Sequence, residues 1–186
     1  MGYEVCLKRK LSMDRIWQQL TIRSDEMNKK IHKIMACIDF SEYSLMVLEY
    51  SVELAKASET NILVYNVINE SNYYSMAAVS MYAQVQVLDE NETRELKEGR
   101  LEWMNELMEK HFPGEKLNIS FRVDVGFPSE QILKTIETEN IDLVIMANKG
   151  RGNIARFLFG SSAEKVFRNS PVPVVSVRER KKFKRQ

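Results

Sequence analysis

A glycine-containing, cationic stretch after residue 146 is the part of the sequence best suited to bind an anion. Glycines let backbone N–H groups approach a phosphate, and a helix N-terminus favours negative charge. Lys149 and Arg151 add positive charge just before an expected helix. Ser161 with Glu164 also fits a capping box, so an ordinary loop explains the stretch equally well. The candidate phosphate-binding residues are Ala147, Asn148, Lys149, Gly150, Arg151, Gly160, Ser161 and Ser162.

Two better-known glycine motifs do not account for this stretch. A P-loop requires Gly-Lys followed by Ser or Thr, and the sequence contains no Gly-Lys pair. Residues 150–155 match Gly-x-Gly-x-x-Ala after an expected strand. A dinucleotide fingerprint, however, needs the first strand of its unit and an acidic residue at the end of the next strand. Here the strand is the fourth of five, and only Glu179 in the tail follows the next one. We interpret the match as accidental.

Asp39 is a second candidate, because it lies at the carboxyl end of the first expected strand. In open α/β sheets, ligands bind beyond the carboxyl ends of the strands. A carboxylate there can accept a hydrogen bond from a ribose hydroxyl or hold Mg²⁺ through water. The simpler interpretation is structural: Asp39 forms a local turn, and Ser41 is the N-cap of the next helix.

The sequence shows no grouping typical of catalytic residues. Its two histidines, His32 and His111, lie outside the loops that would line a ligand site, and we expect both at the surface. The two cysteines, Cys6 and Cys37, are far apart in the sequence, so we expect no disulfide framework. We expect the protein in the reducing environment of the cytoplasm. Cys37 lies within an apolar run, where a cysteine is expected to be a small buried residue.

Short apolar runs alternate with helical patterns through the centre of the chain. Near-continuous apolar runs are typical of parallel strands covered on both faces. The alternation predicts a doubly wound α/β fold, in which right-handed crossovers join the strands of a parallel sheet. Strands are expected at 33–38, 61–68, 117–124, 142–146 and 172–177, and helices at 42–57, 92–111, 129–138 and 161–168. Residues 117–124 alternate apolar and polar, which indicates a half-buried edge strand.

Length, composition and charge set limits on function. The 186 residues suit one domain, and 44% hydrophobic with 28% charged residues excludes a wholly disordered chain. The net charge of +1 divides into +3 for residues 1–32, −7 for 33–177 and +5 for 178–186. An acidic body argues against a nucleic-acid-binding core, although a basic tail can contact nucleic acid or anionic membrane. No apolar stretch approaches about 18 residues, so no membrane-spanning helix is expected.

Three segments lie outside the regular alternation. We expect a folded domain at 33–177, preceded by an extension at 1–32 and followed by a basic tail at 178–186. The extension is either an accessory element or the product of a start codon assigned too far upstream. Residues 69–90 are rich in Tyr, Met and Ser and lack a clear period. They form either a variable connector or a lid or contact surface.

Several of these positions together resemble the universal stress protein family, over residues 33–177. The ATP-binding branch of that family carries Gly-x2-Gly-x9-Gly-Ser/Thr after its fourth strand. This chain has Ala147, Gly150, Gly160 and Ser161 at that spacing, with alanine in place of the first glycine. The other matching positions are Asp39, Val67, the Gly-x-Pro of residues 126–128 and the Pro-Val-Pro-Val of residues 171–174.

The resemblance implies a sheet of strand order 3-2-1-4-5 with helices on both faces and an ATP site at its switch point. Asp39 and Val67 would lie near the nucleoside, with Asp39 also able to hold the Mg²⁺ of Mg-ATP. The glycines and serines of the 147–162 stretch would bind the phosphates. Family members usually form homodimers through the last strand, here residues 172–177. If residue 147 requires a positive φ, its methyl group would crowd the nucleotide; otherwise alanine costs little.

Three functions follow from these observations. The first is an ATP-binding regulator of a stress response, with slow hydrolysis at most. The second is a protein of the same fold that binds no nucleotide and acts as a dimer that contacts protein partners. The third is an ATP-using enzyme, against which the lack of a catalytic grouping argues.

Overall fold

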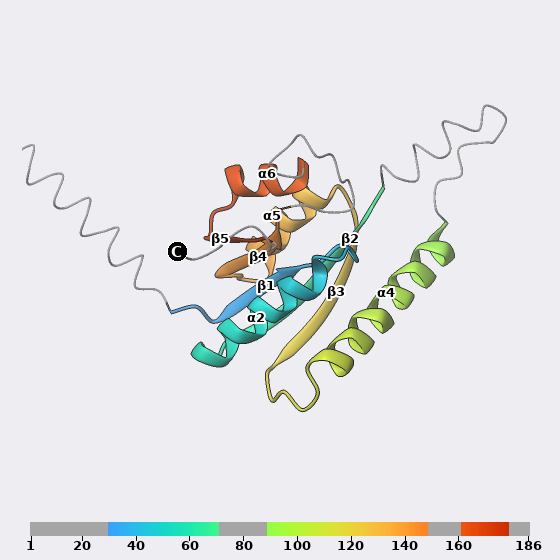
Figure 1. Cartoon of the computed structure of the whole chain (residues 1–186). Helices are drawn as coiled ribbons and strands as arrows, with labels where there is room; N and C mark the ends of the chain where they lie inside the picture. The colour runs from blue at the N-terminus through green and yellow to red at the C-terminus, as the bar shows by residue number, and fades with distance from the viewer. Residues whose placement is uncertain (1–29, 71–88, 149–160, 179–186) are drawn as a thin grey trace, which may run out of the picture. The chain divides into compact units, whose positions relative to one another are not determined.

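The computed structural model describes residues 30–70, 89–148 and 161–178 (Figure 1). These residues form strands alternating with helices. The strands are β1 (Lys33–Cys37), β2 (Asn61–Asn69), β3 (Ile119–Gly126), β4 (Leu143–Ala147) and β5 (Val174–Val177). The helices are α2 (Ser44–Ser58), α4 (Glu90–His111), α5 (Pro128–Thr138) and α6 (Ser161–Asn169). Among the described helices, none combines the length and the apolar character that crossing a bilayer requires.

The five strands form one parallel sheet in the order β3-β2-β1-β4-β5. This confirms both the parallel sheet expected from the apolar runs and the strand order implied by the family resemblance. The central strand β1 pairs with β2 on one side and β4 on the other, so that Ala36 lies between Val64 and Ile145. β3 is an edge strand whose residues are mostly half-buried, as the alternating pattern predicted.

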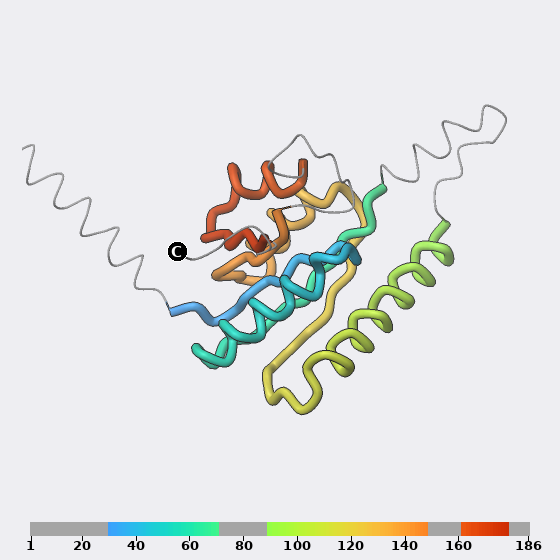
Figure 2. Tube along the Cα trace, in the orientation of Figure 1, coloured from blue at the N-terminus to red at the C-terminus, as the bar shows by residue number. Residues whose placement is uncertain are grey.

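Helices pack on both faces of the sheet, whose backbone Figure 2 traces, and a hydrophobic cluster lies under the helices on each face. Ile34 and Ala36 of β1 join the cluster under α2 and α4. Met35, between them in sequence, joins the cluster under α5 and α6. All three side chains are at most 1% exposed. Because both faces are covered, β1 is apolar along its length rather than alternating.

Local sequence signals account for the starts of two helices. α4 begins with a capping box, in which the Asp89 carboxylate accepts from the Glu92 backbone N–H (2.8 Å) and Glu92 accepts from that of Asp89 (3.1 Å). α5 begins with Pro128 in its first turn, where a missing N–H costs nothing.

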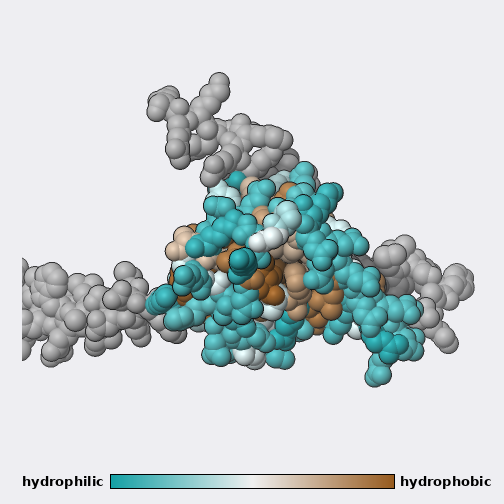
Figure 3. All heavy atoms as spheres, turned by 90° about the horizontal axis from the view of Figure 1, so that it is seen from below, coloured by the Kyte–Doolittle hydropathy of each residue, from teal (hydrophilic) through white to brown (hydrophobic). Residues whose placement is uncertain are grey.

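Charged and polar residues dominate the face seen in Figure 3, with apolar residues visible between them.

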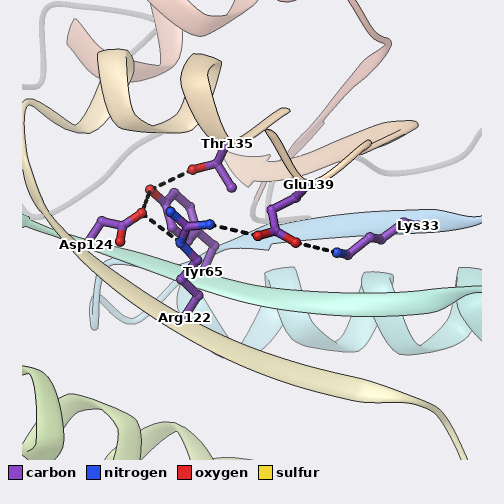
Figure 4. A network of polar contacts seen from close by, with 6 residues as sticks. All are labelled: Lys33, Tyr65, Arg122, Asp124, Thr135 and Glu139. Carbon is purple, nitrogen blue, oxygen red and sulfur yellow. Dashed lines mark hydrogen bonds and ion pairs between the residues drawn. The ribbon is translucent and has the colours of Figure 1, made fainter. Parts of the chain in front are cut away.

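A chain of polar contacts joins α5 to the sheet (Figure 4). The Tyr65 hydroxyl donates to Asp124 (2.7 Å) and accepts from Thr135 of α5 (3.0 Å). Burial raises the pKa of Tyr65, which is 1% exposed, so this hydroxyl stays protonated. The Arg122 guanidinium bridges two carboxylates: its Nε donates to Asp124 (2.9 Å) and its Nη1 donates to Glu139 (2.8 Å). Lys33 ends the chain of contacts, 2.8 Å from the second oxygen of Glu139.

Glu139 makes the stability of the fold depend on pH. The hydrogen bond from Lys33 and the charges of Lys33 and Arg122 lower the pKa of Glu139. A carboxyl with a lowered pKa in the folded state stabilises it above its unfolded pKa, and this stability is lost as the pH falls through the folded value.

We therefore expect Glu139→Gln to lower the melting temperature at pH 7 by about 2–4 °C, the effect of roughly 1 kcal/mol for a partly exposed ion pair in a chain of this size. The difference should narrow as the pH falls below the ordinary glutamate pKa of about 4.3, and it should close only once the pH is below the lowered pKa of Glu139 in the folded state. Thermal melts between pH 3 and 7 measure this. Glu137→Gln, at an exposed position of α5, is the control. A gap that is as wide at pH 3 as at pH 7 would contradict the assignment.

Candidate functional site

The sheet changes direction of winding between β1 and β4. These neighbouring strands are followed by α2 and α6, which pack on opposite faces of the sheet. This is the topological switch point, beyond whose strand ends ligands bind in open α/β sheets. Asp39 follows β1, and Ala147 ends β4. The region therefore collects candidate residues that are more than 100 positions apart in sequence.

Asp39 organises the turn after β1. Its Oδ1 accepts from the Ser41 backbone N–H (3.1 Å) and from the Ser44 hydroxyl (3.4 Å). The Asp39 N–H in turn donates to Ser44 Oγ (3.3 Å). The side chain is half-buried. The turn-forming interpretation of Asp39 is thus visible in the structure, and the same bonds fix the carboxylate at the end of β1.

The start of α2 differs from the sequence-based expectation. Ser41 was expected to be the N-cap, but the helix begins at Ser44 with Tyr43 as its N-cap and without a side-chain cap. A turn intervenes first, closed by the Ser44 N–H donating to the Ser41 carbonyl (3.0 Å). The Ser41 hydroxyl accepts from the Tyr43 N–H (3.3 Å) within this turn. Ser41 therefore supports the Asp39 turn rather than the helix itself.

Phe40 adopts a backbone conformation that is rare for its residue type. Its φ of 61° lies in the left-handed region, which costs a bulky residue roughly 1–3 kcal/mol. The ring packs edge-on against Trp103 of α4, with centroids 4.4 Å apart. The Arg100 guanidinium lies over the same ring, 5.1 Å from its centroid. α4 thus holds the residue next to Asp39 from two sides.

Asn66 of β2 holds the other neighbour of Asp39. It is 2% exposed, and its Nδ2 donates to the Ile38 carbonyl (2.7 Å). Its Oδ1 accepts from Arg100 Nη1 (2.5 Å). Of the residues in this group, Asp39 alone was expected at the site from the sequence. The available signal was Asn66 itself, a polar residue within an otherwise apolar run, which requires a hydrogen-bond partner when buried.

The backbone of Val67 faces the switch point. Along β2, the Tyr65 carbonyl accepts from the Ile38 N–H (2.9 Å) on the β1 side, whereas the Ile62 N–H donates to the Asn118 carbonyl (2.9 Å) on the β3 side. Bonding alternates in this way along a parallel strand. Val67 follows Tyr65 by two positions, so its N–H and C=O are directed to the β1 side, past the last residue of β1. Its side chain is half-buried against the cluster under α5 and α6.

Ala147 lies in β4 with ordinary strand geometry. It pairs with Val177, and the next residue, Asn148, donates its N–H to the Val177 carbonyl (3.2 Å). In the described ranges, the non-glycine residues with positive φ are Phe40, Glu59 and Asn140, so residue 147 is not one of them. The backbone here accommodates alanine without strain. Lys149, Gly150, Arg151 and Gly160 lie outside the described residues.

Ser161 and Ser162 are the first two described residues of α6. Ser161 is exposed and Ser162 half-buried. The capping box expected of Ser161 and Glu164 depends on the residues before Ser161, which lie outside the described residues. Glu164 pairs with Arg168 (2.9 Å). The first N–H groups of a helix have no partner within it and attract anions.

Comparison with known proteins identifies the family. A sequence model of the universal stress protein family matches residues 30–178. The chain belongs to this family. Universal stress protein MJ0577 of Methanocaldococcus jannaschii is 29% identical over 161 residues, which cover 83% of this chain and 99% of the relative. In a comparison of structures, MJ0577 covers 81% of this chain with a TM-score of 0.59 and 26% identity, and 98% of its own chain is matched.

Two further solved structures share the universal stress protein fold and hold an adenine nucleotide. One is a universal stress protein in complex with cAMP, 20% identical, with a TM-score of 0.54 and coverage of 80% of this chain and 98% of that one. The other is a universal stress protein of Archaeoglobus fulgidus in complex with dAMP, which is 16% identical. The match has a TM-score of 0.52 and covers 81% of this chain and 100% of that one. At these identities, the likeness to this universal stress protein is one of fold.

Proposed function

We propose that this universal stress protein binds ATP with Mg²⁺ at the switch point and acts as a nucleotide-gated regulator of a stress response, with slow hydrolysis at most. The observation that supports the proposal is the switch point between β1 and β4. The Asp39 carboxylate follows β1 there, and the Val67 backbone is directed to the β1 side of β2. Relatives of the same fold in complex with cAMP and dAMP support an adenine nucleotide as the ligand.

Val67 would recognise the base. The edge of adenine carries an acceptor at N1 and a donor at N6. The Val67 backbone carries one N–H, which could donate to N1, and one C=O, which could accept from N6. Guanine presents a carbonyl and an N–H at the corresponding positions, the reverse pattern. The β1 side of Val67 therefore favours adenine.

Asp39 would accept a hydrogen bond from the ribose hydroxyls, and the start of α6 would receive the phosphates. A carboxylate accepting from hydroxyl groups makes bonds stronger than those between neutral groups. The phosphate residues are Ser161, Ser162 and Gly160, together with the Ala147–Arg151 stretch, in which Lys149 and Arg151 supply positive charge. The strand geometry of Ala147 supports its compatibility with the family motif.

The Mg²⁺ would be held mainly by the nucleotide. Within the described ranges, no group of three or more His, Cys, Asp or Glu side chains is arranged to hold a metal ion. Mg²⁺ keeps several waters and is bound through substrate phosphates and one or two carboxylates, so Asp39 acting through water fits this pattern. The ion would neutralise phosphate charge, which matters in a domain whose net charge is −7 over residues 33–177.

The edge strand β5 favours a second function, which is compatible with the first. Val174 and Val175 are half-buried on this edge, and the Ser176 hydroxyl is buried without a hydrogen-bond partner among the described residues. An edge strand presents backbone groups that a second copy can pair with. We propose that residues 172–177 form a homodimer interface, within a domain of residues 33–177 flanked by the extension 1–32 and the tail 178–186. Without nucleotide binding, such a dimer would act by contacting protein partners.

Calorimetric titration of the purified chain with ATP and with GTP, each with Mg²⁺, tests the proposed function. We expect saturable binding of ATP, stoichiometric with the chain, and GTP binding at least about tenfold weaker, which is the effect of one mismatched polar contact. Equal affinity for the two nucleotides would contradict base recognition by Val67. Binding of neither would favour the dimer alone.

A further inference from the structure

We infer that Arg100 of α4 is a positioning residue for the ribose of the bound nucleotide, acting through Asp39. The inference rests on the proposed function and adds to it a helix that carries none of the sequence-predicted site residues. Arg100 lies over the Phe40 ring and donates to Asn66, which in turn donates to the Ile38 carbonyl. The two sequence neighbours of Asp39 are therefore both linked to the Arg100 guanidinium. Phe40 contacts it directly, and Ile38 is linked to it through the Asn66 amide.

The side chains in this group leave Asn66 little freedom. Asn66 is 2% exposed, and both ends of its amide are used, Nδ2 by Ile38 (2.7 Å) and Oδ1 by Arg100 (2.5 Å). A buried amide with both ends bonded has a single favourable orientation, because flipping it would place a carbonyl oxygen against the Ile38 carbonyl. Arg100 thereby fixes the amide, and the amide fixes the end of β1.

Phe40 shows why the turn needs support from outside. A φ of 61° is unfavourable for phenylalanine, and such conformations persist only where the surroundings hold them. Here the ring lies between the Arg100 guanidinium at 5.1 Å and the Trp103 ring at 4.4 Å. Both of these residues come from α4, one turn apart on the same face.

α4 is also attached to the sheet by apolar side chains that do not involve Arg100. Met104 and Met108 are buried, and Leu96, Leu101 and Leu107 pack partly buried against the same hydrophobic cluster. Loss of the guanidinium should release the Phe40 turn while leaving the apolar core in place.

The test compares two nucleotides that differ only in the ribose. ATP has the hydroxyls that Asp39 would bind, and 2′,3′-dideoxy-ATP lacks both. We expect Arg100→Met, which keeps an apolar stem, to weaken binding of ATP with Mg²⁺ by about fivefold to twentyfold, the range of a coupling of roughly 1–2 kcal/mol. Binding of the dideoxy nucleotide should change by only about twofold, because its one remaining link to Asp39 is the water on Mg²⁺. Calorimetric titration of the full-length chain measures both affinities.

Two further variants sharpen the result. Arg94→Met is the matched control, because Arg94 lies on the same helix and bonds locally to Asn91 (3.1 Å); it should bind both nucleotides like the wild type. Arg100→Lys keeps the positive charge beside Phe40 and should restore part of the ATP affinity, and it also serves if Arg100→Met fails to fold. Equal weakening of both nucleotides, or no weakening of either, would overturn the inference. Failure of the wild type to bind ATP would instead overturn the proposed function.

Discussion

Replacing Asp39 with alanine is expected to weaken binding of ATP with Mg²⁺ by about 10- to 100-fold, which corresponds to the loss of one or two hydrogen bonds to a charged group. The carboxylate lies at the end of β1, fixed by bonds from Ser41 and Ser44. Its removal deletes the proposed ribose acceptor and loosens the turn together. Calorimetric titration measures the affinity, and a thermal melt shows that the variant is folded.

Two variants separate binding from stability. Asp39→Asn can still accept from the Ser41 N–H but has no charge, so it should keep the turn and lose most of the affinity. Asp142→Ala is the matched control: its carboxylate also organises backbone, accepting from the N–H groups of His32 (2.9 Å) and Lys33 (3.1 Å), but at the amino end of the same strands. It should lose stability without losing ATP binding. ATP affinity that survives in Asp39→Ala would eliminate Asp39 from the site.

Replacing Asn66 with alanine is expected to lower the free energy of unfolding by about 2–3 kcal/mol, a large effect for a polar residue. The substitution leaves the Ile38 carbonyl without its amide donor and removes the contact between Arg100 and Asn66 Oδ1, in a location that is 2% exposed. An orphaned buried polar group costs more than an average hydrogen bond contributes. Urea unfolding monitored by circular dichroism measures the change.

Asn105→Ala is the control for this substitution. Asn105 is exposed on α4 and donates to the Leu101 carbonyl (3.0 Å) within its own helix, so its replacement should change the free energy of unfolding by less than about 0.5 kcal/mol. The effects of Asn66→Ala and Arg100→Met should not add in the double variant, because both break the same contact. A cost for Asn66→Ala as small as that for Asn105→Ala would show that the Asn66 amide does not hold β1.

The fold was predictable because its signals are local. Four apolar runs and the alternating residues 117–124 identified all five strands, and β1 is continuously apolar because Ile34 and Met35 are buried on opposite faces. Boundaries shifted where local hydrogen bonding differs from the regular pattern. α2 starts three residues after Ser41 because the Asp39 turn comes first. β5 starts at Val174 rather than Val172, because the Val172 N–H donates to Ser170 Oγ (3.3 Å) instead of to a strand.

The surroundings of Asp39 could not be predicted, because they depend on long-range contacts. Arg100 and Asn66 are 34 positions apart, and nothing in a helical pattern shows which charged residue will turn toward the sheet. Trp103 was equally hidden, since α4 carries charged residues around most of its surface. The left-handed φ of Phe40 is a consequence of tertiary packing, not of a residue type that favours it.

The nucleotide content of the purified protein tests the central claim most directly. The chain is purified without added nucleotide and denatured, and the supernatant is separated by anion exchange beside ATP, ADP and AMP standards. ATP recovered in proportion to the chain is the predicted result, and ADP in its place would indicate turnover at the same site. A protein that is empty and also fails to bind added ATP with Mg²⁺ would contradict nucleotide binding at the switch point.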